Sequence, residues 1–192
     1  MIVFGDSLTS GENNGFVSFA DYLGIEKRGI SGSCLDEYSI YPVFNGGLLS
    51  QLHDFNGTVL LEYGINDAAS LVTGYVSLAT IMISVAKVYD IVKDAYFLML
   101  TDNDEDLIKL SENYAKYLNE EYLQGLDKIS ADEFFASYLR FSRLMQRKFK
   151  TLYLLPAGFN EFDTDMIHPN DKGYRLIAKH LEDQMKRLPI TW

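Results

Sequence analysis

Short apolar runs alternate with stretches of helical periodicity along the whole chain. Unbroken runs of apolar and β-branched residues predict five strands, over residues 2–4, 25–30, 58–63, 95–100 and 152–155. Apolar residues at helical spacing predict helices over residues 16–23, 48–53, 75–93, 104–125, 131–149 and 170–187. Strands that alternate with helices are joined by right-handed crossovers into a parallel sheet. We therefore predict an α/β fold, a three-layer α/β/α sandwich around a five-stranded parallel sheet.

No feature of this pattern divides the chain. Its 192 residues contain no linker, internal repeat or low-complexity tract, and this length suits one domain. Two predicted helices lie between the fourth and fifth strands, at about residues 103–149. Ser130 and Glu133 have the spacing of a capping box, which would start the second of these helices. We expect a single domain over residues 1–192 with a helical insertion at this point.

Residues 68–86 carry no charge, which raises the question of a membrane span. A spanning helix needs about 20 predominantly apolar residues, and Ser, Thr and Gly interrupt this stretch. We interpret it as a core helix with a polar stripe and predict no membrane span.

An excess of acidic residues narrows the choice of partner. The chain has 27 Asp and Glu against 17 Lys and Arg, a formal net charge of −10. Phosphate backbones and anionic membranes repel such a chain, which disfavours nucleic acid as a partner. The single cysteine, Cys34, cannot form an internal disulfide, and the first residues lack the pattern of a signal peptide. We expect a cytoplasmic protein, and the sequence leaves its oligomeric state open.

Small and hydrogen-bonding residues follow four of the predicted strands. GDSLTSG (residues 5–11) follows the first strand and GISG (29–32) the second. GIND (64–67) follows the third and DMIHP (165–169) the fifth. Because ligands of parallel α/β sheets bind at the carboxyl ends of the strands, we expect these blocks to form one site.

In their order and rough spacing these four blocks resemble those of the SGNH, or GDSL, hydrolases. That family is named for a catalytic Ser, an oxyanion Gly, an oxyanion Asn and a catalytic His, one in each block. The resemblance spans nearly the whole chain. It implies a flavodoxin-like SGNH hydrolase fold and a serine esterase that needs no metal or organic cofactor.

The resemblance makes Ser7 the nucleophile, His168 the general base and Asp165 its orienting carboxylate. The chemistry agrees, because a serine hydroxyl attacks an ester only with a base beside it. Of the three histidines, only His168 has an acid three residues before it and a proline directly after. A short turn would let Asp165 hold Nδ1–H so that Nε2 faces the serine; Asp163 is a rival for this role. Taken alone, the first block would favour a helix cap formed by Asp6 or Ser7.

The oxyanion hole would be formed by the backbone N–H groups of Ser7 and Gly32 and by the side chain of Asn66. Glycine lets its N–H approach a substrate without a Cβ in the way, and an asparagine side chain supplies a fixed N–H donor. A tight turn at Gly32 and an Asx-turn at Asn66 are the structural alternatives.

Tyr38 and Tyr41 lie in an aromatic stretch after the second block, where they could stack on a sugar ring or pack the loop. No long apolar stretch flanks the blocks, as an acyl-chain tunnel would require. We therefore predict a small-molecule or glycan acyl ester as substrate, with an acetyl group on a carbohydrate as the favoured case.

Several other functions remain open at this stage. An acyltransferase would use the same triad, and a lipase or thioesterase would take longer acyl chains. A flavodoxin-like flavin module would use the hydroxyl-rich loop after the first strand but leaves Asn66, Asp165 and His168 without a role. Asp102, Asp104 and Asp106 imitate the start of a calcium loop that then lacks its glycine and glutamate, so we predict an acidic helix start there.

Overall fold

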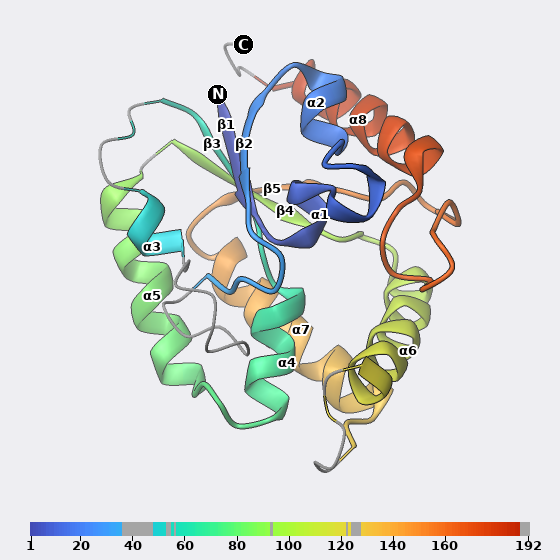
Figure 1. The fold of residues 1–192 in the computed structure, drawn as a ribbon. Coiled ribbons are helices and arrows are strands. Elements are labelled where there is room, and N and C mark those ends of the chain that lie inside the picture. Colours follow the sequence, from blue (N-terminus) through green and yellow to red (C-terminus); the bar gives the residue numbers. More distant parts are fainter. Residues whose placement is uncertain are drawn as a thin grey trace.

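The computed structural model describes residues 1–35, 48–52, 55, 57–92, 94–121, 123 and 128–188. Within these residues, five parallel strands form one sheet in the order β2-β1-β3-β4-β5 (Figure 1). The strands are β1 (Ile2–Gly5), β2 (Glu26–Gly29), β3 (Val59–Glu62), β4 (Ala95–Met99) and β5 (Lys150–Tyr153). The predicted α/β fold with a five-stranded parallel sheet is confirmed.

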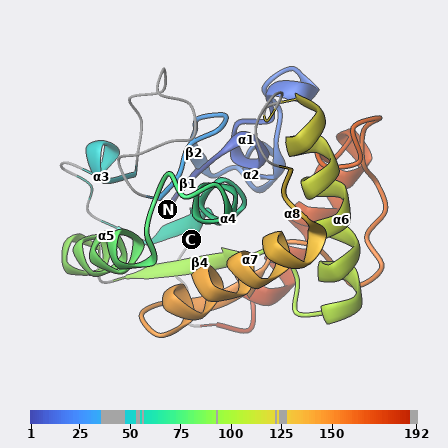
Figure 2. The same ribbon diagram turned by 90° about the horizontal axis from the view of Figure 1, so that it is seen from below.

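Helices cover both faces of the sheet (Figures 1 and 2). One face carries α1 (Ser7–Ser10), α2 (Phe19–Leu23) and α8 (Asp171–Met185), with the 3₁₀-helix η1 (Glu12–Asn14) directly after α1. The other face carries α3 (Leu48–Gln51), α4 (Ile65–Val72), α5 (Leu78–Ile91), α6 (Asp104–Glu121) and α7 (Ala131–Gln146). The position of each strand in the sheet explains its composition. The central strands β1, β3 and β4 are buried along their whole length, as their unbroken apolar runs predict, while the edge strands β2 and β5 are partly exposed.

The uncharged stretch 68–86 belongs to two helices, so the prediction of one core helix there was wrong. Helix α4 starts directly after β3, because Gly64 adopts φ 135° and turns the chain into the helix. The chain leaves α4 at Thr73, and Ser77 then caps α5 by accepting a hydrogen bond from Thr80 N–H. Within the described residues no helix is both long and apolar enough to cross a membrane.

Capping residues set the start of two other helices. Ser130 and Glu133 form the predicted capping box at the start of α7, which is confirmed. Ser18 and Asp21 form a second capping box, so α2 starts at Phe19. Phe16 was predicted within this helix but lies outside it, 65% exposed and with φ 63°.

A pair of carboxyl groups is buried at the carboxyl edge of the sheet. Glu62 ends β3 and Asp6 follows β1, and their exposed fractions are 2% and 1%. Glu62 Oε2 accepts hydrogen bonds from Asp6 N–H (3.2 Å) and Thr9 Oγ1 (3.0 Å). A Cβ at Gly5 would lie 2.6 Å from the same oxygen, so glycine makes room for the pair. Burial raises the pKa of both carboxyl groups, and repulsion from Asp6 raises the pKa of Glu62 further.

This pair should make the free energy of unfolding fall as the pH rises. With pKa values raised in the folded state, the native protein retains protons that the unfolded chain releases above about pH 4. Glu62→Gln keeps an acceptor oxygen and removes one titrating group. The loss of unfolding free energy between about pH 5 and about pH 8 should then be smaller by about 1–3 kcal/mol in urea unfolding.

Glu105→Gln provides the control for this prediction, because it removes the same charge from an exposed position on α6. Its pH dependence should follow that of the wild type. An unchanged pH dependence in Glu62→Gln would show that the buried pair does not hold a proton in the folded state.

Candidate active site

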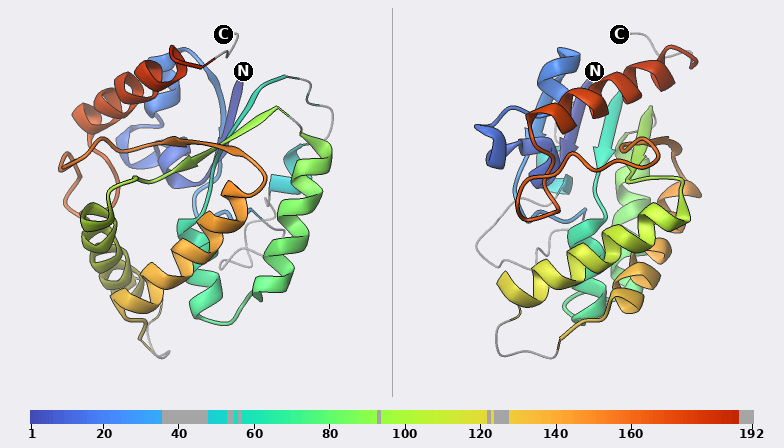
Figure 3. Two further views of the ribbon diagram at one scale, coloured as in Figure 1. Left: turned by 180° about the vertical axis from the view of Figure 1, so that it is seen from behind. Right: turned by 90° about the vertical axis from the view of Figure 1, so that its right-hand side faces the viewer.

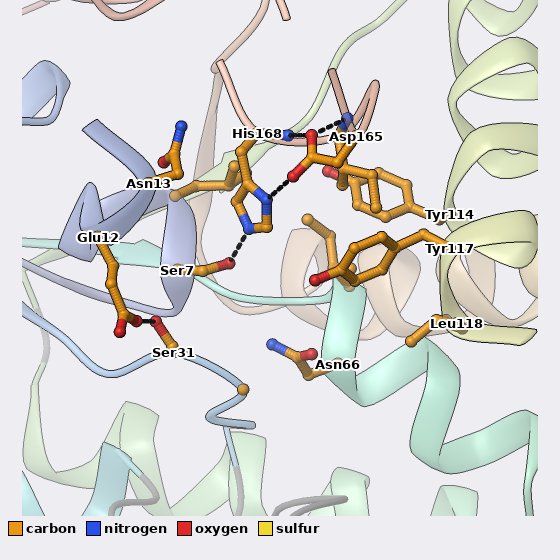
Figure 4. Close-up of a pocket in the computed structure, with 14 residues that line it drawn as sticks. Ser7, Glu12, Asn13, Ser31, Asn66, Tyr114, Tyr117, Leu118, Asp165 and His168 are labelled. Carbon is orange, nitrogen blue, oxygen red and sulfur yellow. Dashed lines mark hydrogen bonds and ion pairs between the residues drawn. The ribbon is translucent and has the colours of Figure 1, made fainter. Parts of the chain in front are cut away.

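All five residues predicted for the catalytic centre line one cavity of about 400 Å³ (Figure 4). Ser7 lies after β1, Gly32 after β2, Asn66 after β3, and Asp165 and His168 after β5. They meet because the carboxyl ends of parallel strands share one edge of the sheet. Tyr38 and Tyr41, the predicted substrate-binding residues, lie outside the described residues.

Ser7 is placed at the cavity by the turn between β1 and α1. It is the first residue of α1, and Asp6 caps this helix through a 3.0 Å hydrogen bond from Leu8 N–H to Oδ1. The N–H groups of a first helical turn have no acceptor within the helix. The turn therefore combines both sequence interpretations, since Asp6 forms the cap and Ser7 faces the cavity.

His168 contacts both Ser7 and Asp165. Its Nε2 lies 2.9 Å from Ser7 Oγ, and its Nδ1 lies 2.6 Å from Asp165 Oδ2. The other oxygen of Asp165 accepts hydrogen bonds from the N–H groups of Ile167 (2.9 Å) and His168 (3.0 Å). The Asp-x-x-His spacing thus produces a closed turn in which the carboxylate orients the ring. Asp163, the rival for this role, accepts a hydrogen bond from Asn13.

The protonation of Asp165 determines the tautomer of His168. Partial burial would raise the pKa of Asp165, but the hydrogen bonds from His168 and from the N–H groups of Ile167 and His168 lower it below its usual value. An ionised carboxylate can only accept hydrogen bonds. Nδ1 therefore carries the hydrogen and donates a hydrogen bond to Asp165. The Nε2 lone pair is then directed at the hydroxyl of Ser7.

Asn13 joins the two ends of the chain beside this contact, a role that the sequence did not predict. Its Nδ2 donates to Asp163 Oδ2 (2.8 Å) and to the carbonyl of Pro169 (2.9 Å), directly after His168. Its Oδ1 accepts from the hydroxyl of Tyr174 on α8 (3.1 Å). The loop that carries the histidine is therefore held against the loop that follows the serine.

The Asn66 side chain faces the cavity but is already hydrogen-bonded. Its Nδ2 donates to Asp6 Oδ2 (3.0 Å) and to the carbonyl of Ser33 (3.1 Å), which are as many bonds as a primary amide has N–H groups. An oxyanion would have to share or replace one of these acceptors. The predicted role of Asn66 as an oxyanion donor stays a prediction, and the structure adds that it ties the third block to the first and to Ser33, directly after the second.

Gly32 follows β2 in a turn that ends with a hydrogen bond from Ser33 N–H to the carbonyl of Ile30 (3.0 Å). Its φ of 76° lies in the left-handed region, so a tight turn requires glycine here. Gly32 therefore forms a tight turn and also lines the cavity. A tight turn at Gly32 is compatible with the predicted role of its N–H in the oxyanion hole.

Helix α6 forms a wall of the cavity, through residues that the sequence did not identify as site residues. Tyr114, Tyr117 and Leu118 line it, and the Tyr117 ring meets the His168 ring edge to face with centroids 6.1 Å apart. Figure 3 shows α6 beside the loop between β5 and α8, where Asn113 Nδ2 donates to the carbonyl of Met166 (3.2 Å). Helical spacing showed which residues of α6 turn inward but not that some of them face a cavity.

Comparison with known proteins shows similarity in structure. Neither a family model nor a curated protein sequence matches the chain. The psychrotrophic esterase EstA from Pseudoalteromonas sp., inhibited by monoethylphosphonate, superposes with a TM-score of 0.59 at 16% identity, covering 97% of this chain and 96% of that one.

Two further solved structures superpose over most of this chain. A carbohydrate esterase gives a TM-score of 0.55 at 14% identity, covering 98% of this chain and 68% of that one. A putative lipolytic protein of the G-D-S-L family from Desulfitobacterium hafniense DCB-2 gives 0.50 at 16% identity, covering 93% and 95%. At these identities the likeness concerns the fold. The chain has the fold of the SGNH, or GDSL, hydrolases.

Proposed function

We propose that this chain is a serine esterase that cleaves short-chain acyl esters. The observation that supports this most directly is the continuous series of hydrogen bonds from Asp165 through His168 to Ser7, at the wall of an open cavity. This arrangement combines a nucleophile, its base and an orienting carboxylate. These are the groups that an enzyme needs to transfer an acyl group through a serine.

In the proposed reaction Ser7 Oγ attacks the ester carbonyl carbon while its proton passes to His168 Nε2. Asp165 stabilises the imidazolium that forms. The tetrahedral oxyanion lies near the N–H groups of Ser7 and Gly32 and the amide of Asn66. His168 then protonates the departing alcohol, and the acyl group stays on Ser7. Water attacks this acyl-enzyme and gives a proton to His168. His168 then returns this proton to Ser7 Oγ as the bond between Oγ and the acyl carbon breaks, which releases the carboxylic acid and restores the enzyme.

The dimensions of the cavity support a short acyl group. Its volume of about 400 Å³ is near the lower end of the range for small-molecule sites, about 300–1,000 Å³. On the side of α6 and α4, the wall of the cavity is formed by Tyr117, Leu118 and Ile65. We propose an acetyl ester of a carbohydrate as substrate, in line with the carbohydrate esterase among the similar structures. Tyr38 and Tyr41 stay our candidates for contact with the sugar.

Ser7→Ala should abolish turnover and labelling by a fluorophosphonate probe, because it removes the hydroxyl that is hydrogen-bonded to His168 Nε2. Ser10→Ala, in the same short helix but away from the cavity, should keep the label. Mass spectrometry of the labelled peptide identifies the residue that reacts. Circular dichroism checks that each variant is folded. Esterase activity in folded, purified Ser7→Ala protein would refute the proposed mechanism.

Asn66→Ala should lower kcat by roughly 10²- to 10³-fold with little change in KM, if the amide acts on the transition state. The same change also removes the hydrogen bonds to Asp6 and Ser33, so the melting temperature is measured alongside. Asn66→Asp keeps the shape without the donor and should lose kcat similarly. A loss that appears mainly in KM would place Asn66 in substrate binding.

Acetyl and propionyl esters should be turned over faster than octanoyl esters, since the α6 wall limits the length of the acyl group. Leu118→Ala should raise the octanoyl-to-acetyl ratio of kcat/KM, because each methylene that finds apolar surroundings contributes about 0.8 kcal/mol. Leu110→Ala creates a similar void on α6 outside this cavity and should leave the ratio unchanged. A wild-type rate that rises steadily with chain length would instead indicate a lipase or thioesterase.

A further inference from the structure

The ionisable side chains of the cavity give it a negative potential. Among the described residues, Glu12 and Asp165 are the carboxylates that line it, beside His168 and the phenols of Tyr114 and Tyr117. In the part of the chain that the structure describes, neither lysine nor arginine lines it. The whole chain carries a formal net charge of −10. A cavity walled by protein focuses such a field onto a ligand.

Glu12 is the one carboxylate of the cavity with no part in the proposed reaction. It is the first residue of η1, and its Oε2 accepts a hydrogen bond from Ser31 Oγ in the turn that carries Gly32. This bond holds the charge beside the proposed oxyanion hole. Figure 4 shows Glu12 on the opposite side of Ser7 from Tyr117, whose ring presents an aromatic surface.

We infer that the site selects esters whose alcohol carries a positive charge, such as an amino sugar or another amino or quaternary ammonium alcohol, and that Glu12 determines this preference. The inference rests on the proposed esterase function and specifies its substrate class. A cation near the cavity mouth is attracted by the Glu12 carboxylate and by the aromatic ring. A carboxylate or phosphate on the alcohol is repelled by the same groups and finds no basic partner in the described cavity wall.

The expected size of the effect follows from Coulomb's law. A unit charge about 6 Å from Glu12, in surroundings between water and a protein surface, changes the rate ratio on the order of three- to tenfold. Salt screens exposed charges, so the effect should decrease at high ionic strength. Glu12 affects which substrate is preferred and takes no part in the chemical step. Its removal should therefore change the ratio of kcat/KM between cationic and neutral esters.

Three acetate esters with matched alcohols test this inference. Acetylcholine is cationic, 3,3-dimethylbutyl acetate has the same shape without the charge, and 3-acetoxypropionate is anionic. We expect kcat/KM in wild type to be lowest for the anionic ester. Glu12→Gln keeps an acceptor for Ser31 and should lower the cationic-to-neutral ratio about three- to tenfold. The control Glu105→Gln, which removes a charge outside the cavity, should leave the ratio unchanged.

The outcomes separate the inference from the function on which it rests. An equal cationic-to-neutral ratio in wild type and Glu12→Gln, or preference for the anionic ester, would overturn the inference while hydrolysis of the neutral ester upholds the esterase. Failure to hydrolyse any of the three esters would overturn both. A wild-type ratio that falls between about 0.05 M and about 0.5 M salt, in a manner absent from Glu12→Gln, would support the inference.

Discussion

The carboxylate of Asp6 is the interaction on which the arrangement of the site depends. One of its oxygens caps the helix that starts with Ser7, and the other accepts the amide of Asn66. Its backbone N–H is held by Glu62 at the end of the neighbouring strand. A single buried side chain therefore links the first and third blocks, and any movement of one block is transmitted to the other. Such a buried group is retained only because each of its oxygens has a donor.

The second constraint is the distance along the chain between the reacting groups. Ser7 and His168 are separated by 161 residues, yet Nε2 and Oγ lie 2.9 Å apart. The sheet brings their strands to one edge, and Asn13 then fastens the two loops together. The turn around Asp165 orients the imidazole locally. The sheet thus places the two loops, Asn13 holds the loops together, and the Asp165 turn orients the His168 ring. Each of these contributions acts over a shorter distance than the one before.

Helix α6 combines a structural and a functional role. Its apolar side buries Leu107, Leu110 and Tyr114, as its helical spacing predicted, and it packs against α7, where the Tyr114 ring stacks on Phe134. Tyr114 also lines the cavity, and within the next turn Tyr117 and Leu118 form the rest of this wall. The segment predicted as an insertion between the fourth and fifth strands therefore forms part of the site. Periodicity identifies an inward-facing residue but does not distinguish a core from a cavity.

The sequence by itself determined the strands, the parallel sheet, the capping box at Ser130 and the residues that meet around Ser7. The strands, the capping box and the Asp-x-x-His turn are local, because they are encoded within a few neighbouring residues. The parallel sheet followed from the alternation of strands and helices, and the meeting of the four blocks from their positions at strand ends and from the family resemblance. Only the tertiary structure decided that the amide of Asn66 is shared with Asp6 and that Glu62 is buried beside it. These contacts join groups 60 and 56 residues apart, and they are set by packing and the exclusion of water rather than by local pattern.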